Sequence, residues 1–347
     1  MIGTWSLPGP AAAVGRILTS VLRDRVLVVH SPRGGSGLHE ALCTHVYTLS
    51  RTPIAIEASS AVGFHVALCA LIGSAETVPV AVLTGSEPLR GAVVILTASG
   101  ALDADVQSFA RIAARLQEDL GPCLLVVSSD TQARVDDSDP HELRGVVGPL
   151  DSAAYAAWLP RSGRPLFEQF VASVAVEVAA WDVELLDRLT ALPLAQAFRP
   201  DQHVAAWCDG RAVAWSGLPP RWEVGSLDRW GGVDVEHPAW LAANRPHMLE
   251  KRVWRGQLST VLPWIEDHRM RLIERNKRLL RPSGPSDDIA LLDWGPLVLQ
   301  LKARDGKRAQ TMSQFRNARN ELAHGRPLGW DHIRACIAGS ADLIDAC

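Results

Sequence analysis

The chain has 347 residues, a mass of 37.5 kDa and a net charge of −3, with 47% hydrophobic residues and a mean hydropathy of +0.06. These values exclude a disordered or fibrous chain, and at about 100–200 residues per domain the length predicts two or three domains. The six cysteines form no CxxC pair, and no signal peptide pattern is present, so we expect a reduced, cytoplasmic setting. The longest apolar stretch, residues 61–75, is shorter than the roughly 20 residues of a spanning helix, so we expect no membrane partner.

The small net charge hides an uneven distribution of charged residues. Lys and Arg number 10, 8 and 17 in residues 1–150, 151–250 and 251–347, while Asp and Glu number 14, 13 and 11, so only the last third is basic. Eleven of the twelve tryptophans follow residue 150. A basic block of this size attracts anionic partners such as RNA, and on helices it is equally typical of a solvated face.

Residues 1–150 show strands alternating with helices. Short apolar runs predict strands over residues 26–30, 53–58, 78–83, 92–97 and 123–128. Helical patterns fall between them, including residues 38–49 and 103–120. Continuous Val, Leu and Ile runs are typical of strands covered on both faces, so this part predicts a parallel α/β sheet.

A glycine-rich segment follows the first predicted strand directly. Its candidate nucleotide-binding residues are Gly34, Gly35, Ser36 and Gly37. A glycine-rich turn between a strand and a helix aims backbone N–H groups at a phosphate. In the pattern GxxxxGK[ST], however, only Gly37 matches, because Leu38 and His39 occupy the Lys and Ser/Thr positions. We therefore expect no ATP hydrolysis; a structural turn, and a site that binds phosphate or nucleotide without turnover, both remain open.

This layout, with Ser128, Ser129 and Asp130 ending a later predicted strand, resembles P-loop NTPases of the AAA+/STAND type. It is most similar to the inactivated versions found in bacterial conflict systems. The resemblance covers residues 1–150 and implies a degenerate P-loop domain that acts as a sensor or a scaffold.

The middle of the chain, residues 151–236, is predicted to be helical. Residues 166–180 and 183–189 predict helices, and residues 204–208 and 212–215 flank Asp209-Gly210, a dipeptide suited to a tight hairpin turn. Helices followed by a hairpin suggest a winged-helix-like module, and a plain bundle with a loop is the alternative. Residues 216–237 lack periodicity and predict a linker or a loop packed on a partner.

The last third, residues 237–347, predicts a helical bundle. Helical patterns begin after Pro238, with a break at Pro246, a kink at Pro263 and a stop near residues 281–285. Further helices are predicted over residues 289–303, 309–324 and 331–346. The expected fold class is thus α/β plus all-α: a parallel sheet domain over 1–150, a helical middle over 151–236 and a bundle over 237–347.

The helix predicted over 309–324 gathers groups suited to phosphate chemistry. They are Arg316, Arg319, Asn320 and His324, beside an apolar stripe of Met312, Phe315, Ala318 and Leu322. Because Arg319 falls inside the stripe, it needs an anion or hydrogen-bond acceptors. Residues 266–269, Glu-Asp-His-Arg on an earlier helix, are one candidate for an acidic partner, and a solvated face is the other reading. An arginine can neutralise a phosphate and a histidine can move a proton near neutral pH, as metal-independent RNA cleavage requires.

The string Arg319-Asn320-x-x-x-His324 matches the RNxxxH motif of the HEPN superfamily, all-helical domains of which many are RNases. The resemblance covers residues 238–347. It implies that Arg319 contacts the scissile phosphate, that His324 is the general acid/base and that Asn320 orients it. It also implies a homodimer, because family members usually build the site between two copies. Arg316 is a further candidate for phosphate or RNA binding, and we expect no metal or other cofactor, because the histidines lack ligand spacing.

Two readings of function follow. The first is a defence or stress protein of a bacterial, antiviral conflict system, with a sensor or scaffold domain that lacks hydrolysis and a HEPN-like domain that cleaves RNA without metal. The second is a non-catalytic scaffold or adaptor, or a nucleotide-binding switch, that docks protein partners through its tryptophans. The sequence leaves open whether the chain is an enzyme.

Overall fold

The computed structural model describes residues 3–31, 37–57, 63–117, 121–136, 139–159, 165–208, 210–283, 288–302 and 306–345. The chain divides into two compact units. The first unit contains Met1–Asp151 and Pro220–Glu236, and the second contains Ser152–Pro219 and His237–Cys347. The predicted three-part division differs from these units in where residues 151–236 fall, and it stays a prediction.

The first unit is built on a parallel sheet, as predicted. Its strands are β1 (Val26–His30), β2 (Pro53–Glu57), β3 (Val93–Ala98), β4 (Cys123–Ser128) and β5 (His141–Glu142). They lie in the order β2-β3-β4-β1-β5, and each neighbouring pair is parallel. The central strand β4 pairs with β3 along its whole length and with β1 from Leu124 to Ser128, which fixes the register of the sheet.

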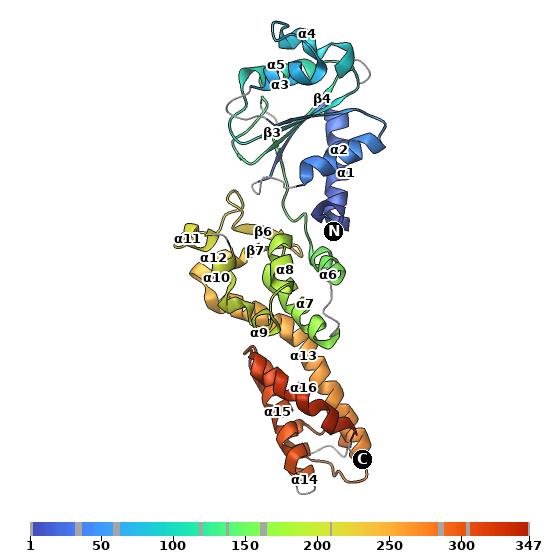
Figure 1. Ribbon diagram of the computed structural model, residues 1–347, viewed down its shortest axis with the longest axis vertical. Helices are drawn as coiled ribbons and strands as arrows, with labels where there is room; N and C mark the ends of the chain where they lie inside the picture. The colour runs from blue at the N-terminus through green and yellow to red at the C-terminus, as the bar shows by residue number, and fades with distance from the viewer. Residues whose placement is uncertain are drawn as a thin grey trace. The chain divides into compact units, whose positions relative to one another are not determined.

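Helices cover both faces of this sheet (Figure 1). Helices α1 (Pro8–Asp24) and α2 (Leu38–Thr48) lie on one face, and α3 (Phe64–Ile72), α4 (Val80–Thr84) and α5 (Ala104–Ala113) lie on the other. The side chains of each inner strand alternate between the two cores, as a side-chain period of two requires. Burial on both faces explains the continuous apolar runs in the sequence and confirms that expectation.

Two predictions for this unit were wrong. Residues 78–83 do not form a strand, because α4 begins after Pro79, which has φ −60° and no N–H for a ladder. Within α4, Val80 and Leu83 are buried at helical spacing while Val82 is exposed. Helix α5 ends at Ala113 rather than at residue 120; beyond it Leu116 lies close to Gly121, and residues 118–120 of the predicted helix lie outside the described residues.

The hairpin predicted at Asp209-Gly210 was also wrong. Its flanks form two short helices, α10 (Val204–Trp207) and α11 (Arg211–Ala214). The hairpin that forms joins β6 (Leu227–Trp230) to β7 (Val233–Glu236), in the segment expected to be a linker. Its turn residues Gly231 and Gly232 have φ +63° and +84°, and a two-residue turn with both central φ angles positive favours a Gly-Gly pair. The winged-helix prediction depended on a hairpin at this position, where the flanking segments are helical instead.

The second unit is helical. Its helices include α7 (Pro165–Ala179), α8 (Val183–Thr190), α9 (Leu194–Phe198), α12 (Pro238–Asn244), α13 (Pro246–Asn276), α14 (Trp294–Leu301), α15 (Gly306–Ala323) and α16 (Trp330–Asp345). Helix α6 (Pro149–Trp158) contains the boundary between the units. Pro263 lies inside α13, as predicted. The helix predicted over 289–303 is shorter, because a 3₁₀ turn, η4 (Ile289–Leu291), precedes α14.

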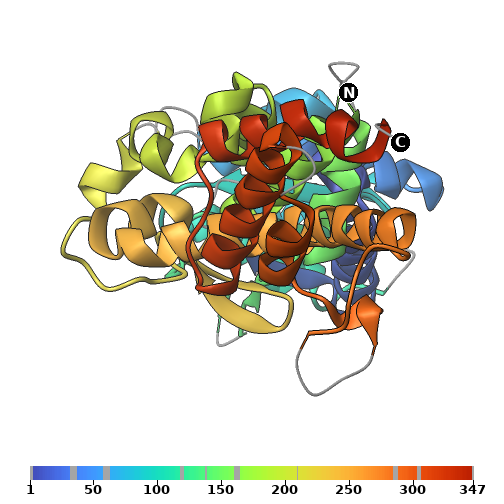
Figure 2. The ribbon, with the colours of Figure 1, turned by 90° about the horizontal axis from the view of Figure 1, so that it is seen from below.

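Helices α13 to α16 share one apolar core, which confirms the predicted C-terminal bundle. Figure 2 shows α15 and α16, in red, over the long orange α13. Phe170 from α7 and Phe198 from α9 join this core, so the middle helices and the bundle are continuous. No helix in the described part of the chain is long and apolar enough to cross a membrane.

Candidate functional site

Helix α15 buries the stripe that the sequence predicts. Met312, Phe315, Ala318 and Leu322 are each fully buried. The helix ends at Ala323, and Gly325, with φ +77°, donates its N–H to the carbonyl oxygen of Leu322. The packing of this stripe leaves the polar residues of the motif at the edge of the bundle core.

Arg319 forms an ion pair with a carboxylate of the same chain. Its side chain is 34% exposed, and Nη2 lies 3.1 Å from Oδ2 of Asp293, which is half-exposed. Its Nη1 donates to Oδ1 of Asn320 over 3.2 Å. Asp293 also accepts from the N–H of Trp294 at the start of α14 over 2.8 Å. The ion pair therefore joins the start of α14 to the last turns of α15.

His324 lies one residue past the end of α15 and is exposed. Its backbone N–H donates to the carbonyl oxygen of Asn320 over 3.0 Å, while its imidazole makes no hydrogen bond to any residue that the structure describes. Arg316 is half-buried, and its one described hydrogen bond is a long one, 3.5 Å, to Asn317. The structure thus joins Arg319 to Asn320 and leaves the His324 ring in solvent.

Residues 266–269 do not supply the acid for Arg319. Glu266 instead accepts from Nε of Arg269 over 2.6 Å. The Arg269 guanidinium also donates to the carbonyl oxygens of Ala290 and Leu292, over 3.0 and 2.7 Å, and so secures the turn before Asp293. Asp293 was not among the predicted site residues; its position before an apolar run is the N-cap signal that identifies it.

Little in the described residues supports a metal or a tryptophan docking surface. No group of three or more His, Cys, Asp or Glu side chains among them is placed to hold a metal ion. Of the eleven tryptophans after residue 150, Trp158 alone is exposed, at 69%, and the other ten are buried or half-buried. Most tryptophans therefore serve the core of their unit.

The carboxyl edge of the parallel sheet is a second candidate site. The chain leaves β1 through α2 on one face toward β2, and then returns through β3 and β4 with α3 to α5 on the other face. Strand β1 therefore ends at the point where the winding direction reverses, and ligands of open α/β sheets bind at such a point.

The described residues at the carboxyl edge of the sheet differ from those of a phosphate loop. Gly37 begins α2 with φ +73°, while the other candidate residues, Gly34, Gly35 and Ser36, lie outside the described residues. His39 Nδ1 lies 3.1 Å from Oγ1 of Thr97 at the end of β3. The first turn of α2 thus presents an imidazole where a phosphate loop has a hydroxyl.

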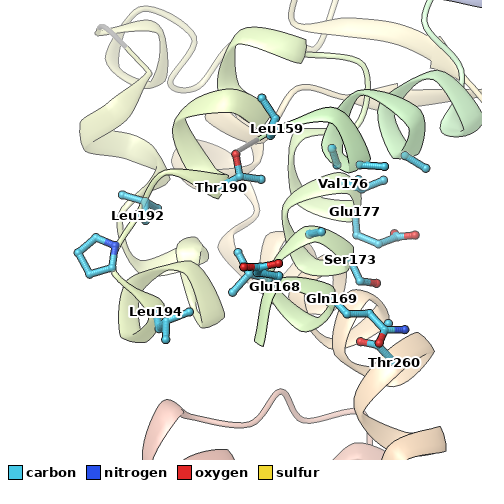
Figure 3. Close-up of a pocket in the computed structure, with 16 residues that line it drawn as sticks. Leu159, Glu168, Gln169, Ser173, Val176, Glu177, Thr190, Leu192, Leu194 and Thr260 are labelled. Atoms are coloured by element: carbon cyan, nitrogen blue, oxygen red, sulfur yellow. The ribbon is translucent and has the colours of Figure 1, made fainter. Parts of the chain in front are cut away.

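A pocket of about 970 Å³ lies in the second unit, apart from the predicted residues (Figure 3). Glu168, Ser173 and Glu177 of α7 line it together with Thr190, Leu192 and Leu194. Burial raises the pKa of Glu177, although Arg255 and Arg252 oppose the shift. The two carboxylates are nine residues apart, about two and a half helical turns, and Figure 3 shows them on different sides of α7. The hydroxyls of Ser173 and Thr190 already bond to backbone carbonyls, so the polar groups do not converge on one ligand.

Comparison with known proteins identifies no relative: no family model, no curated protein and no solved structure matches this chain.

Proposed function

We propose that the C-terminal bundle is a metal-independent endoribonuclease that works as a homodimer, with Arg319, Asn320 and His324 as its active residues. The observation that carries the proposal is that Arg319 and Asn320 lie in the last turns of α15 and His324 directly follows the helix, at the solvent edge of a buried stripe. The resemblance to HEPN RNases gives these positions their roles.

The Arg319–Asp293 ion pair is compatible with phosphate binding because both groups face solvent. Exposed pairs of this kind contribute about 0.2–1 kcal/mol, so a phosphate dianion or diester can displace the carboxylate. A guanidinium also matches the geometry of two phosphate oxygens. Arg319 is therefore held in place in the free protein and available to a substrate.

The chemistry follows from the side chains. His324 takes the proton from a ribose 2′-hydroxyl, the 2′-oxygen attacks the adjacent phosphorus, and the bond to the 5′-oxygen breaks. An imidazolium, from the second copy in a dimer, returns a proton to the leaving 5′-oxygen, while Arg319 neutralises the charge on the phosphate oxygens. The products are a 2′,3′-cyclic phosphate and a 5′-hydroxyl.

Cleavage of end-labelled RNA in EDTA tests the proposal directly. We expect cleavage by the wild type and by Arg326→Ala, a matched control in which an exposed arginine paired with Glu321 is removed from the same region. Arg319→Ala and His324→Ala are expected to lower the rate by about 10²- to 10⁴-fold. Equal rates for all variants, or cleavage that requires metal, would contradict the proposal. Absence of cleavage by every protein across a range of RNAs would favour the scaffold reading, in which Arg319 and Asp293 only fasten α14 to α15.

We also propose that the carboxyl edge of the sheet binds a phosphate or nucleotide without hydrolysing it, as the sensor of a conflict-system protein. The reversal of winding at β1 supports this second function. Calorimetry with ATP, ADP and GTP should give binding heat without added metal, no phosphate release, and weaker binding after His39→Ala. No heat with any of the three would exclude nucleotide binding.

A further inference from the structure

The last turns of α13 and the segment that follows the helix carry a concentration of positive charge. Residues 271–281 contain five cations and a single acid, Glu274. The cations are Arg271, Arg275, Lys277, Arg278 and Arg281, and all five are exposed. Among the described residues, no acidic side chain lies within ion-pairing distance of any of them.

Other arginines of the same unit behave differently. Arg326 pairs with Glu321 at 2.7 Å, and Arg334 pairs with Asp331 at 3.1 Å. The negative end of a helix dipole favours cations, but its effect falls off within the last turn and does not reach Arg271, five residues before the end of α13. The concentration of unpaired charge therefore needs a further explanation.

Three of these arginines follow one another at the end of α13. Arg271 and Arg275 have the spacing i, i+4 on one side of the helix, and Arg278 follows in the turn after the helix, which ends at Asn276. Leu272 and Ile273 face the other way and are almost completely buried in the bundle core. We call Arg271, Arg275 and Arg278 the basic stripe.

The helix that carries the basic stripe also contacts the turn beside the proposed active site. Arg269 of α13 lies two residues before Arg271, about 200° around the helix and so on the side away from the stripe, and it donates to the carbonyl oxygen of Leu292 over 2.7 Å. The next residue, Asp293, lies 3.1 Å from Arg319. One helix therefore carries the stripe on one side and, on the other, the arginine that secures the turn before the active-site ion pair.

From these observations we infer that the basic stripe binds the phosphodiester backbone of the RNA strand that the Arg319–His324 site cuts. The inference rests on the proposed function for the identity of that strand. Exposed arginines contact phosphates without reading bases, so binding is independent of sequence. The strand is unpaired, because in-line attack by a 2′-hydroxyl needs a nucleotide that can leave a helical stack. A membrane surface fits less well, because the apolar face of α13 is already buried in the protein.

The test measures binding to a fluorescent 2′-O-methyl oligouridylate, which lacks the hydroxyl needed for cleavage, by anisotropy over a range of salt. The variant is Arg271→Gln/Arg275→Gln/Arg278→Gln in the full chain. With about 0.7 counterions released per phosphate contact on a single strand, the slope of log K against log salt should become shallower by about 2. The same relation gives roughly 100-fold weaker binding at 0.1 M salt.

The matched control is Arg23→Gln/Arg326→Gln/Arg334→Gln, which removes three exposed arginines that each have an acidic partner. We expect this control to keep the wild-type slope. Equal slopes for wild type and stripe variant, or equal losses in both triple variants, would overturn the inference. So would a stripe variant that loses binding to phosphatidylserine vesicles and keeps binding to the oligonucleotide.

Cleavage kinetics separate this inference from the proposed function. The stripe variant should raise KM for RNA with little change in kcat, because it removes binding that is the same in the ground and transition states. An unstructured DNA strand should inhibit cleavage competitively without being cut. If oligonucleotide binding depends on the stripe but no RNA is cleaved, the ribonuclease proposal fails while the stripe remains a nucleic-acid surface.

Discussion

Arg319 forms its ion pair with a carboxylate that is itself half-exposed, and in the proposed function a phosphate competes with that carboxylate. Asp293→Asn tests the competition, since asparagine keeps the N-cap of α14 and removes the negative charge. We expect RNA to bind about 1.5- to 5-fold more tightly, which corresponds to the 0.2–1 kcal/mol of an exposed ion pair. Anisotropy with the 2′-O-methyl oligonucleotide measures the change, and weaker binding by Asp293→Asn would show that Arg319 serves α14 rather than a phosphate.

The ion pair of Arg319 shows which contacts of a single residue the sequence could predict and which it could not. Helical periodicity correctly placed Arg319 beside a buried stripe and required an anion for it. Asp293, however, belongs to a different helix 26 residues earlier, and periodicity within α15 carries no information about that contact. The acid that the sequence suggested, Glu266, instead accepts from Arg269 on its own helix.

We expect the stability of the bundle to depend on pH through His268. It is 6% exposed, packs against Trp264 and Phe315, and donates from Nδ1 to the carbonyl oxygen of Trp264. Burial lowers its pKa, with Arg271 adding to the shift and the Trp264 carbonyl and Asp267 opposing it. Because the unfolded chain binds this proton more readily, stability is full above the unfolded pKa, about 6.5, and declines as pH falls through it.

The measurement for His268 is denaturant unfolding of the full chain, followed by tryptophan fluorescence, at several pH values between 5 and 8. His268→Phe keeps an aromatic ring beside Phe315 and removes the titrating group. The free energy of unfolding of the wild type, minus that of the variant, should fall as pH falls below about 6.5. A constant difference across this range would remove His268 as the cause.

At the scale of elements, the crossing of α7 and α13 depends on Gly256. A Cβ at this position would lie 2.6 Å from Cα of Val174 and 2.9 Å from the carbonyl oxygen of Ser173, both backbone atoms. Gly256→Ala should therefore destabilise the second unit by about 1–3 kcal/mol, because the two helices must separate. Gly295→Ala in α14 is the control, since nothing lies within 4 Å of its Cβ and alanine favours a helix by up to about 1 kcal/mol. Equal melting temperatures for the two variants would contradict the close crossing.

The helices and strands also show which sequence patterns predicted the structure well and which did not. Runs such as Val26–His30 and Cys123–Ser128 were predicted with their bounds because burial on both faces forces continuous apolar residues. The turn at Asp209-Gly210 has hairpin chemistry, yet its flanks are helical. A turn dipeptide permits a hairpin without requiring one; pairing is decided by what the two flanks pack against, which is a tertiary property.

At the scale of the whole molecule, the β6–β7 hairpin belongs to the first unit. Asp228 of β6 is 6% exposed and accepts from the N–H of Gly145 over 2.9 Å, and Arg144 reaches Asp234 of β7 at 3.3 Å. These contacts join residues 227–236 to the sheet unit across more than 80 positions of sequence. The hairpin therefore contributes to the stability of the first unit. Residues 152–219, which lie between the sheet and the hairpin in the sequence, belong to the second unit.

Asp228→Ala tests this discontinuous organisation. Loss of a buried acceptor leaves the Gly145 N–H unsatisfied and should lower the stability of the first unit by about 1–3 kcal/mol. Hydrogen exchange in the full chain should then show faster exchange in β1, β3 and β4, with α13 and α15 unchanged. If residues 151–236 instead formed a domain of their own, the same substitution would speed exchange in α7 and α8 and spare the sheet. The two outcomes distinguish a sheet unit completed by a distant hairpin from the three successive domains that composition alone favours.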